Sequence, residues 1–306
     1  MEVTLVKKCF IFLLSLCLIA GLAGCGGTSE KAANTDGKLK VAVSFDAMRE
    51  FVQAVGGDKV SIIEIIPDGT EPHEFQPTAK RMKLLHDANV FVMQGLGMEP
   101  WAEAMIKAAD NPKLVVVEAG TGVSAITNTD EDEIKEHGQY DPHAWLSPSC
   151  AQIEVQNIAD GLAKADPKNA GYYQANAKAY KEQLQALQNE YTQKFSALPH
   201  KDFVTGHAAF AYLCRDFGLE QKSVESVFAA GEPTTNQMKE LVDYCRDNHV
   251  KTIFSEELVS PKTSETLARE VGAKVQPIHT MESSEGGATY LDRMKENLQR
   301  IYESLQ

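Results

Sequence analysis

The segment Pro167–Leu198, PKNAGYYQANAKAYKEQLQALQNEYTQKFSAL, decides the fold because it predicts one long helix. Asp166 is expected to cap this helix, and Pro167 is tolerated at a first helical position. Apolar residues recur at steps of three and four and form one stripe: Tyr173, Ala177, Tyr180, Leu184, Leu187, Tyr191 and Phe195. Such a period is typical of a helix with one buried face. At about 1.5 Å per residue the helix would be roughly 48 Å long, enough to tie two domains together.

Strand-like segments flank this helix on both sides. Apolar and β-branched runs before it predict strands at 40–45, 60–66, 89–93 and 113–118, with helical segments such as 47–55 and 78–87 between them. Runs after it predict strands at 203–205, 223–227, 251–255 and 274–278. Alternating strands and helices predict a mainly parallel sheet. A coiled coil is the alternative for the apolar stripe, but the stripe lasts only about four heptads.

The predicted fold is therefore α/β, with two lobes joined by one long spine helix. We expect an N-terminal lobe at 39–165, the linking helix at 166–199 and a C-terminal lobe at 200–306. The 306 residues include 43% hydrophobic and 24% charged residues, a balance typical of soluble globular domains. The formal net charge of −13 argues against a nucleic-acid partner, because phosphates require clusters of Lys and Arg.

The N-terminus predicts export and a lipid anchor. Lys7 and Lys8 precede the apolar run Cys9–Ala23, which is short for a spanning helix and typical of a secretory signal. The run ends in Leu22–Cys25 (LAGC), which resembles a bacterial lipobox with Cys25 as the lipidated residue. An ordinary cleaved signal is the alternative. We expect a signal peptide at 1–24, a flexible tether at 25–38 and an extracytoplasmic, membrane-anchored protein.

Three cysteines remain for the folded part: Cys150, Cys214 and Cys245. At most one disulfide could form among them, and their spacing fits no zinc cluster. We expect buried free thiols.

Histidines at loop corners are the candidate ligands. His73 follows a predicted strand, His143 precedes a helix start marked by Ser147 and Pro148, and His207 follows the first strand of the second lobe. The last strand is followed by His279 and Glu282. Three imidazoles and a carboxylate can supply a closed four-ligand site that suits Zn²⁺. Separations of roughly 65 to 75 residues exclude a zinc finger, so a folded cleft must bring these side chains together.

At this point the chain resembles the metal-binding solute receptors of bacterial ABC importers, of the ZnuA/TroA/PsaA type. The matching motifs are Thr70–Phe75 (TEPHEF), Gly95–Trp101 (GLGMEPW), Asp141–Trp145 (DPHAW), Gly206–Phe210 (GHAAF) and Gly231–Pro233 (GEP). The resemblance implies a metal between two α/β lobes and delivery of that metal to a membrane permease. It also implies that His73, His143 and His207 are the first three ligands.

The fourth ligand stays open between two residues. The segment Thr280–Ser283 (TMES) resembles the zinc-binding branch, in which Glu282 would be the ligand, and we favour it. His279 could coordinate instead and give four histidines. Manganese-binding relatives have a carboxylate where His207 stands, since Mn²⁺ prefers oxygen ligands. His207 therefore favours Zn²⁺ over Mn²⁺.

One segment departs from the resemblance. Zinc receptors of this family often carry a His-rich loop before the second ligand, whereas this chain has the acidic segment Asp130–His137 (DEDEIKEH). A solvated acidic loop is the first interpretation, and a weak cation collector is the alternative. The other histidines, His86, His200 and His249, are expected to lie at the surface or at element boundaries.

The predicted function is capture of a divalent metal ion and its delivery to an ABC permease by a monomeric lipoprotein. A zinc-dependent hydrolase is an alternative of another class, but it would need an open coordination position and a general base, and the chain has no HExxH-type helix. An organic-ligand receptor, such as a siderophore binder, would need an aromatic or Arg-rich cleft. We further expect the metal affinity to fall as the pH drops through the range in which histidine is protonated. We also expect the long helix to limit closure of the two lobes.

Overall fold

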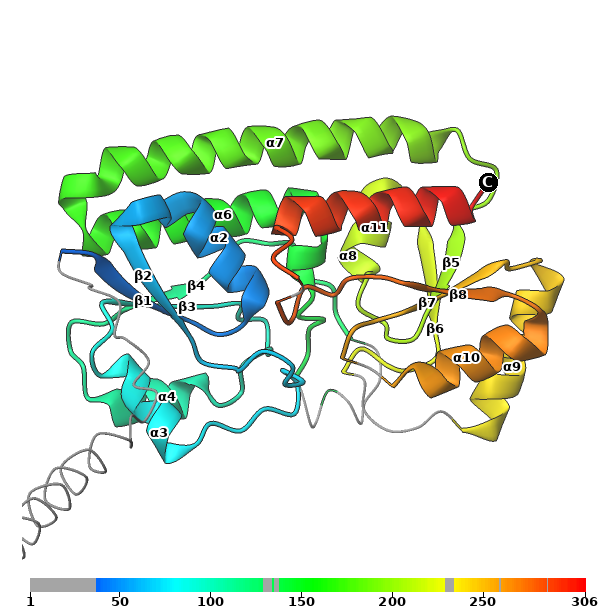
Figure 1. Cartoon of the computed structure of the whole chain (residues 1–306), viewed down its shortest axis with the longest axis horizontal. Helices are drawn as coiled ribbons and strands as arrows, with labels where there is room; N and C mark the ends of the chain where they lie inside the picture. The colour runs from blue at the N-terminus through cyan, green and yellow to red at the C-terminus, as the bar shows by residue number, and fades with distance from the viewer. Residues whose placement is uncertain (1–36, 129–133, 135–137, 229–233, 259, 285) are drawn as a thin grey trace, which may run out of the picture. The chain divides into compact units, whose positions relative to one another are not determined.

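The computed structural model describes residues 37–306 apart from 129–133, 135–137, 229–233, 259 and 285. Within this part, two lobes, each built on a four-stranded parallel sheet, are joined by the long helix α7 (Figure 1). This architecture confirms the predicted α/β fold. The predicted signal peptide and nearly all of the tether fall outside the described residues and stay predictions, as do the domain boundaries. Among the described helices, none has the length and apolar character needed to cross a membrane.

The N-terminal lobe has the strand order β2-β1-β3-β4. Its elements are β1 (Leu39–Val43), α2 (Asp46–Gly56), β2 (Val60–Glu64), α3 (Ala79–Met82), β3 (Val90–Met93), α4 (Ala102–Ala109), β4 (Val115–Glu118) and α6 (Pro148–Ala165). All four residues of the central strand β3 are buried, as expected of a parallel strand covered on both faces. The helix predicted at 78–87 is shorter, because α3 gives way to a 3₁₀ turn at Lys83–Leu85.

The C-terminal lobe repeats the plan with the order β6-β5-β7-β8. Its elements are β5 (Asp202–Thr205), α8 (Ala211–Phe217), β6 (Glu220–Ser223), α9 (Thr235–Asp247), β7 (Thr252–Ser255), α10 (Pro261–Val271), β8 (Lys274–Pro277) and α11 (Tyr290–Ser304). The strand predicted at 223–227 was wrong by three residues. The edge strand β6 is polar and partly exposed, whereas Val224 belongs to the loop that follows it.

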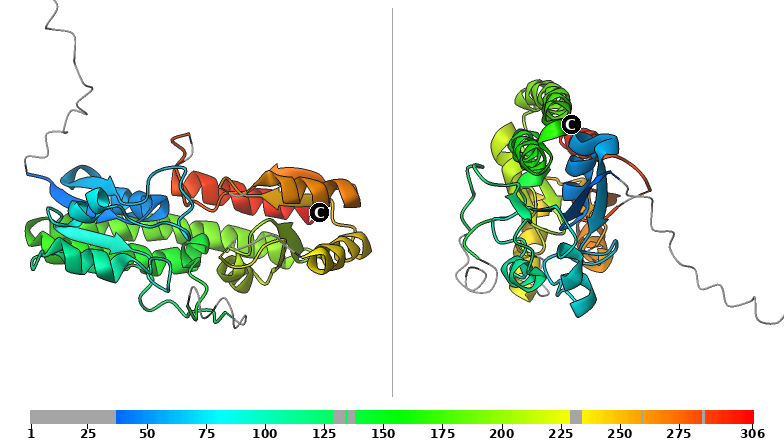
Figure 2. Two further views of the ribbon diagram at one scale, coloured as in Figure 1. Left: turned by 90° about the horizontal axis from the view of Figure 1, so that it is seen from below. Right: turned by 90° about the vertical axis from the view of Figure 1, so that its left-hand side faces the viewer.

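Helix α7 (Ala170–Ser196) is the predicted link between the lobes. It buries six residues of the predicted stripe, and Tyr180 is partly buried. The helix packs against α2 and α6 in the first lobe and against α8 and α11 in the second, which excludes an isolated coiled coil (Figure 2). The expected cap was wrong in detail. Asp166 precedes a 3₁₀ turn, and its carboxylate accepts hydrogen bonds from the Asn169 side chain (2.6 Å) and the Tyr173 hydroxyl (2.9 Å) rather than from a backbone N–H.

Candidate metal centre

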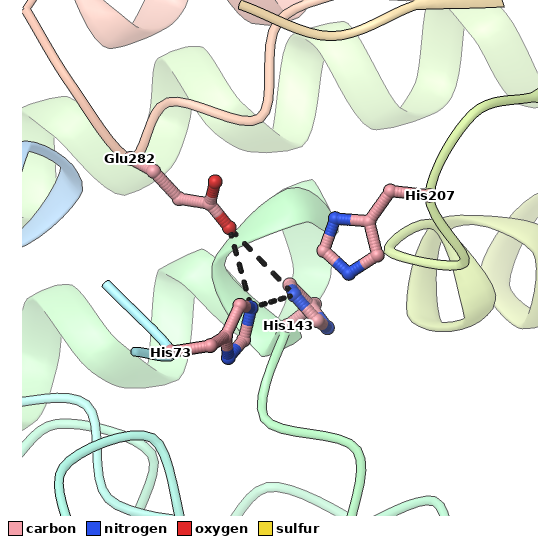
Figure 3. Close-up of side chains that lie close together, drawn as sticks. All are labelled: His73, His143, His207 and Glu282. Carbon is pink, nitrogen blue, oxygen red and sulfur yellow. Dashed lines mark hydrogen bonds and ion pairs between the residues drawn. The ribbon is translucent and has the colours of Figure 1, made fainter. Parts of the chain in front are cut away.

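Four residues from separate segments meet between the lobes. His73 lies in the loop after β2, His143 directly precedes the 3₁₀ turn Ala144–Leu146, His207 follows β5, and Glu282 follows β8. One ligand atom from each lies within 4.8 Å of the other three (Figure 3). Parallel α/β sheets bring their loops together at the carboxyl ends of the strands, which is where ligands bind in such folds. The fold therefore gathers the four side chains that were named from the sequence.

The spacing of the facing atoms suits one small metal ion. His73 Nε2 lies 3.1 Å from His143 Nε2, and Glu282 Oε1 lies 3.7 Å from each of them. Ligand atoms bound at about 2.0–2.1 Å to a tetrahedral Zn²⁺ lie about 3.3 Å from one another. The observed distances bracket this value, so the three atoms could bind one ion after small side-chain shifts.

The cluster is closed off from solvent. His143, His207 and Glu282 are at most 3% exposed, and His73 is 9% exposed. Glu282 Oε2 accepts a hydrogen bond from the Thr280 hydroxyl (2.9 Å), whereas the buried Oε1 has no hydrogen-bond partner among the described residues. A buried carboxylate oxygen without a partner is costly. A cation at the centre of the cluster would satisfy Oε1, and in this sense the residues fit a metal.

Neighbouring groups orient two of the imidazoles. His143 Nδ1 donates to Asp141 Oδ1 (2.8 Å), and the same oxygen accepts from the His143 backbone N–H (2.9 Å). This contact favours the tautomer whose Nε2 lone pair faces the cluster. His207 Nε2 lies 2.6 Å from the carbonyl oxygen of Val227, which can only accept a hydrogen bond, so Nε2 carries the proton. The lone pair of the neutral ring is then on Nδ1, which is free to bind a metal. Such partners of the second ring nitrogen are typical of metal-binding histidines.

The electrostatics of the cluster favour a cation. Burial, assisted by the charge on His143, lowers the pKa of His207 to about 3, so this ring is neutral at physiological pH. Burial alone would lower the pKa of His73, but the neighbouring Glu282 carboxylate outweighs the effect of burial and raises this pKa. Burial alone would raise the pKa of the Glu282 carboxyl, but the three imidazoles outweigh burial and lower this pKa, with His73 contributing most. Protonation of His73 would therefore compete with the binding of a metal ion at the cluster.

Glu71 adds a further carboxyl at the edge of the cluster. Its Oε1 accepts a hydrogen bond from the His73 backbone N–H (3.1 Å). Burial, followed by the charge on Glu282, raises the pKa of Glu71 to about 7. Glu71 therefore changes charge near physiological pH.

The structure separates the two candidates for the fourth ligand. The cluster contains Glu282 and leaves out His279, whose Nε2 lies 3.1 Å from Glu296 Oε2. His86, His200 and His249 are exposed, as expected. Cys150, Cys214 and Cys245 are buried free thiols. Cys25, Gly231–Pro233 and the acidic segment Asp130–His137, apart from Ile134, lie outside the described residues.

Sequence reasoning missed the residues that support the ligands. Asp141 stands two residues before His143 in the motif DPHAW, so the motif did contain a signal for it. The carbonyl of Val227 left no signal, because any residue could supply it. A second acidic group, Asp46, Glu64 and Asp68, also comes close together, but Arg49 and Arg293 pair with Asp46 there. That group is part of an ion-pair network.

Two parallel α/β lobes on a long helix, with three imidazoles and one carboxylate buried between them, define a two-lobed receptor of the metal-binding type. Residues 41–304 match the family described as zinc-uptake complex component A, periplasmic (ZnuA), and the chain belongs to this family. This confirms the resemblance stated above. Membership of an uptake family also supports the expectation of a receptor rather than an enzyme.

Individual relatives agree with this family. The chain is 35% identical over 310 residues to the high-affinity zinc uptake system protein ZnuA of Bacillus subtilis, covering 96% of this chain and 97% of that protein. It is 34% identical over 307 residues to the zinc-binding lipoprotein AdcA of Streptococcus pneumoniae serotype 4, covering 96% of this chain and 60% of that longer protein. A crystal structure of ZnuA matches with a TM-score of 0.78 at 30% identity, covering 88% of this chain and 100% of the other.

Proposed function

We propose that this protein captures Zn²⁺ outside the cytoplasmic membrane and delivers it to the permease of an ABC importer. The observation that carries the proposal is the buried cluster of His73, His143, His207 and Glu282, in which Glu282 Oε1 has no hydrogen-bond partner among the described residues. Three nitrogen ligands and one oxygen ligand suit Zn²⁺ better than Mn²⁺, which prefers oxygen. Four protein ligands close a tetrahedral site, as expected of binding rather than catalysis.

The lipid anchor and the permease are parts of the same proposal. The lipobox-like segment ending at Cys25 supports lipidation, and the relative AdcA is named a lipoprotein. The family description, a component of a zinc-uptake complex, supports a membrane partner that receives the ion. Replacing Cys25 by Ser should release the protein from the membrane fraction without changing its metal affinity. Retention of that variant in the membrane after its signal peptide has been cleaved would contradict a lipid anchor at Cys25.

Competitive titration tests the metal assignment. The chelator-stripped protein is titrated with Zn²⁺ and Mn²⁺ against a chromophoric chelator, alongside the variants His207→Ala, Glu282→Ala and His279→Ala. We expect one tight Zn²⁺ site that is weakened strongly by the first two changes. The matched control His279→Ala removes a nearby imidazole outside the cluster and should leave the affinity unchanged. A preference for Mn²⁺, or equal losses in all three variants, would overturn the assignment.

A further inference from the structure

The loop that carries Glu282 has an unusual backbone conformation. Met281, directly before the ligand, has φ 61° and is fully buried. A bulky residue with a positive φ is disfavoured, so surrounding contacts must hold the chain in this conformation. We call residues 279–284 the ligand loop.

The C-terminal lobe holds the first half of the ligand loop. The Glu257 carboxylate accepts hydrogen bonds from the backbone N–H groups of Thr280 (3.1 Å) and Met281 (3.0 Å). The Asn297 side chain in α11 binds both backbone groups of His279, the first residue of the loop. It accepts from His279 N (2.8 Å) and donates to His279 O (2.7 Å). These contacts fix the loop up to the strained residue.

The N-terminal lobe holds the second half. The backbone N–H of Gly69 donates to Ser283 Oγ (2.8 Å), and the backbone N–H of Ser284 donates to Asp68 Oδ1 (3.0 Å). Asp68 and Gly69 belong to the same loop as the ligand His73. The segments carrying two of the four ligands, one from each lobe, are therefore hydrogen-bonded directly to each other.

Arg293 anchors this junction from inside the protein. It lies in α11, whose first turns face α2 of the N-terminal lobe (Figure 1). Arg293 Nη1 donates to the carbonyl oxygen of Ser283 (3.0 Å), and Nη2 pairs with Asp46 Oδ2 at the start of α2. Arg293 is 1% exposed and Asp46 is fully buried. One guanidinium thus joins the residue after Glu282 to the opposite lobe through a buried ion pair.

We propose that Arg293, anchored on Asp46, is a positioning residue that holds Glu282 against the three imidazoles. The proposal rests on the metal-receptor function proposed above. Two donors in a fixed planar fork allow Arg293 to hold Ser283 and Asp46 at the same time, which a Lys ammonium does not reproduce. Without this contact the strained loop relaxes and Glu282 withdraws, while the three imidazoles stay where they are.

A double-mutant cycle on the full chain, purified in a mild detergent, tests this role. Zn²⁺ affinity is measured by chelator competition for the wild type, Arg293→Lys, Glu282→Ala and the double variant. Outer contacts of metal ligands typically change affinity by about 10–100-fold, so Arg293→Lys should weaken binding by at least roughly tenfold. In the Glu282→Ala background the same change should have no further effect, because the ligand it positions is gone.

The matched control is Arg300→Lys. Arg300 lies two turns further along α11 and contacts Glu296 and the carbonyl oxygen of Pro277 instead of the ligand loop. It should leave the Zn²⁺ affinity within twofold. If Arg293→Lys does not fold, Asp46→Asn replaces it in the same cycle, since Asn keeps an oxygen acceptor but removes the buried charge.

The outcomes are distinct. Equal losses from Arg293→Lys in the wild type and in the Glu282→Ala background, or no loss in the wild type, would overturn the positioning role while leaving the metal-receptor function intact. A wild-type chain without a tight Zn²⁺ site would overturn the proposed function, and the positioning role with it. Loss only in the presence of Glu282 supports the proposal.

Discussion

Replacing Asp141 by Asn should weaken Zn²⁺ binding by about 10–100-fold, equivalent to about 1.4–2.7 kcal/mol. Asp141 Oδ1 accepts from both the backbone N–H (2.9 Å) and Nδ1 (2.8 Å) of His143, and it is 2% exposed. An Asn side chain can place an amide oxygen at the same position. The change therefore removes a negative charge and makes His143 a weaker base without forcing the loop to move. If the Asn amide turned its NH₂ group toward His143 Nδ1, the imidazole would carry its proton on Nε2. In that tautomer Nε2 has no lone pair for the metal.

Chelator competition on the metal-free protein measures this loss, with chemical denaturation of the same samples as a check on folding. Asp166→Asn is the matched control, because Asp166 is also a buried hydrogen-bonded aspartate but lies at the turn between α6 and α7. It should lower stability without changing the affinity. Binding by Asp141→Asn within twofold of the wild type, or an equal loss in the control, would refute the reasoning.

Four further predictions concern protons, packing, helix stability and lobe motion. Zn²⁺ affinity should fall by about tenfold per pH unit once the pH drops below the raised pKa of His73, because the ion must displace the proton beside Glu282; constant affinity down to about pH 5 would contradict it. Denaturant titration should show Gly161→Ala destabilised by about 1–3 kcal/mol, since a Cβ there would collide with Val117 Cγ2. A Cβ at Gly171 in α7 would meet open space, so Gly171→Ala should instead raise the free energy of unfolding by about 0.5–1 kcal/mol. Small-angle scattering should show little compaction on Zn²⁺ binding, because contacts such as Gly69 to Ser283 already join the lobes.

The fold could be predicted where burial leaves a pattern in the sequence. The stripe of α7 has the helical period because one face of the helix is buried, and the central strands β1 and β3 are apolar because both faces of the sheet are covered there. The edge strand β6 (EQKS) buries none of its four residues, so it lacks the apolar pattern that the edge strands β2 and β4 have. The sequence pattern therefore pointed three residues too far along the chain.

The site, like the fold, could be predicted where its residues lie in a recognisable local sequence pattern. Strand-to-helix corners determine where His73, His143 and His207 lie, and such corners are marked by Gly, Pro and capping residues. Glu282 lies in the cluster and His279 does not, and between them stands Met281 with a left-handed backbone conformation. Gly or Asn usually marks such a conformation, and this chain has Met. Cross-lobe partners such as Arg293 depend on long-range packing and leave no local pattern.

The charges around the cluster explain why a carboxylate beyond the ligands matters. Zn²⁺ held by three neutral imidazoles and Glu282 would leave a buried group with a net charge of about +1, which is costly in a protein interior. Asp141, hydrogen-bonded to His143, supplies the missing negative charge. If His207 were a carboxylate, the same assembly would carry an excess negative charge. The balance therefore makes Asp141 part of the charge compensation for a divalent ion, and Asp141→Asn should weaken Zn²⁺ binding even though none of the four cluster residues changes.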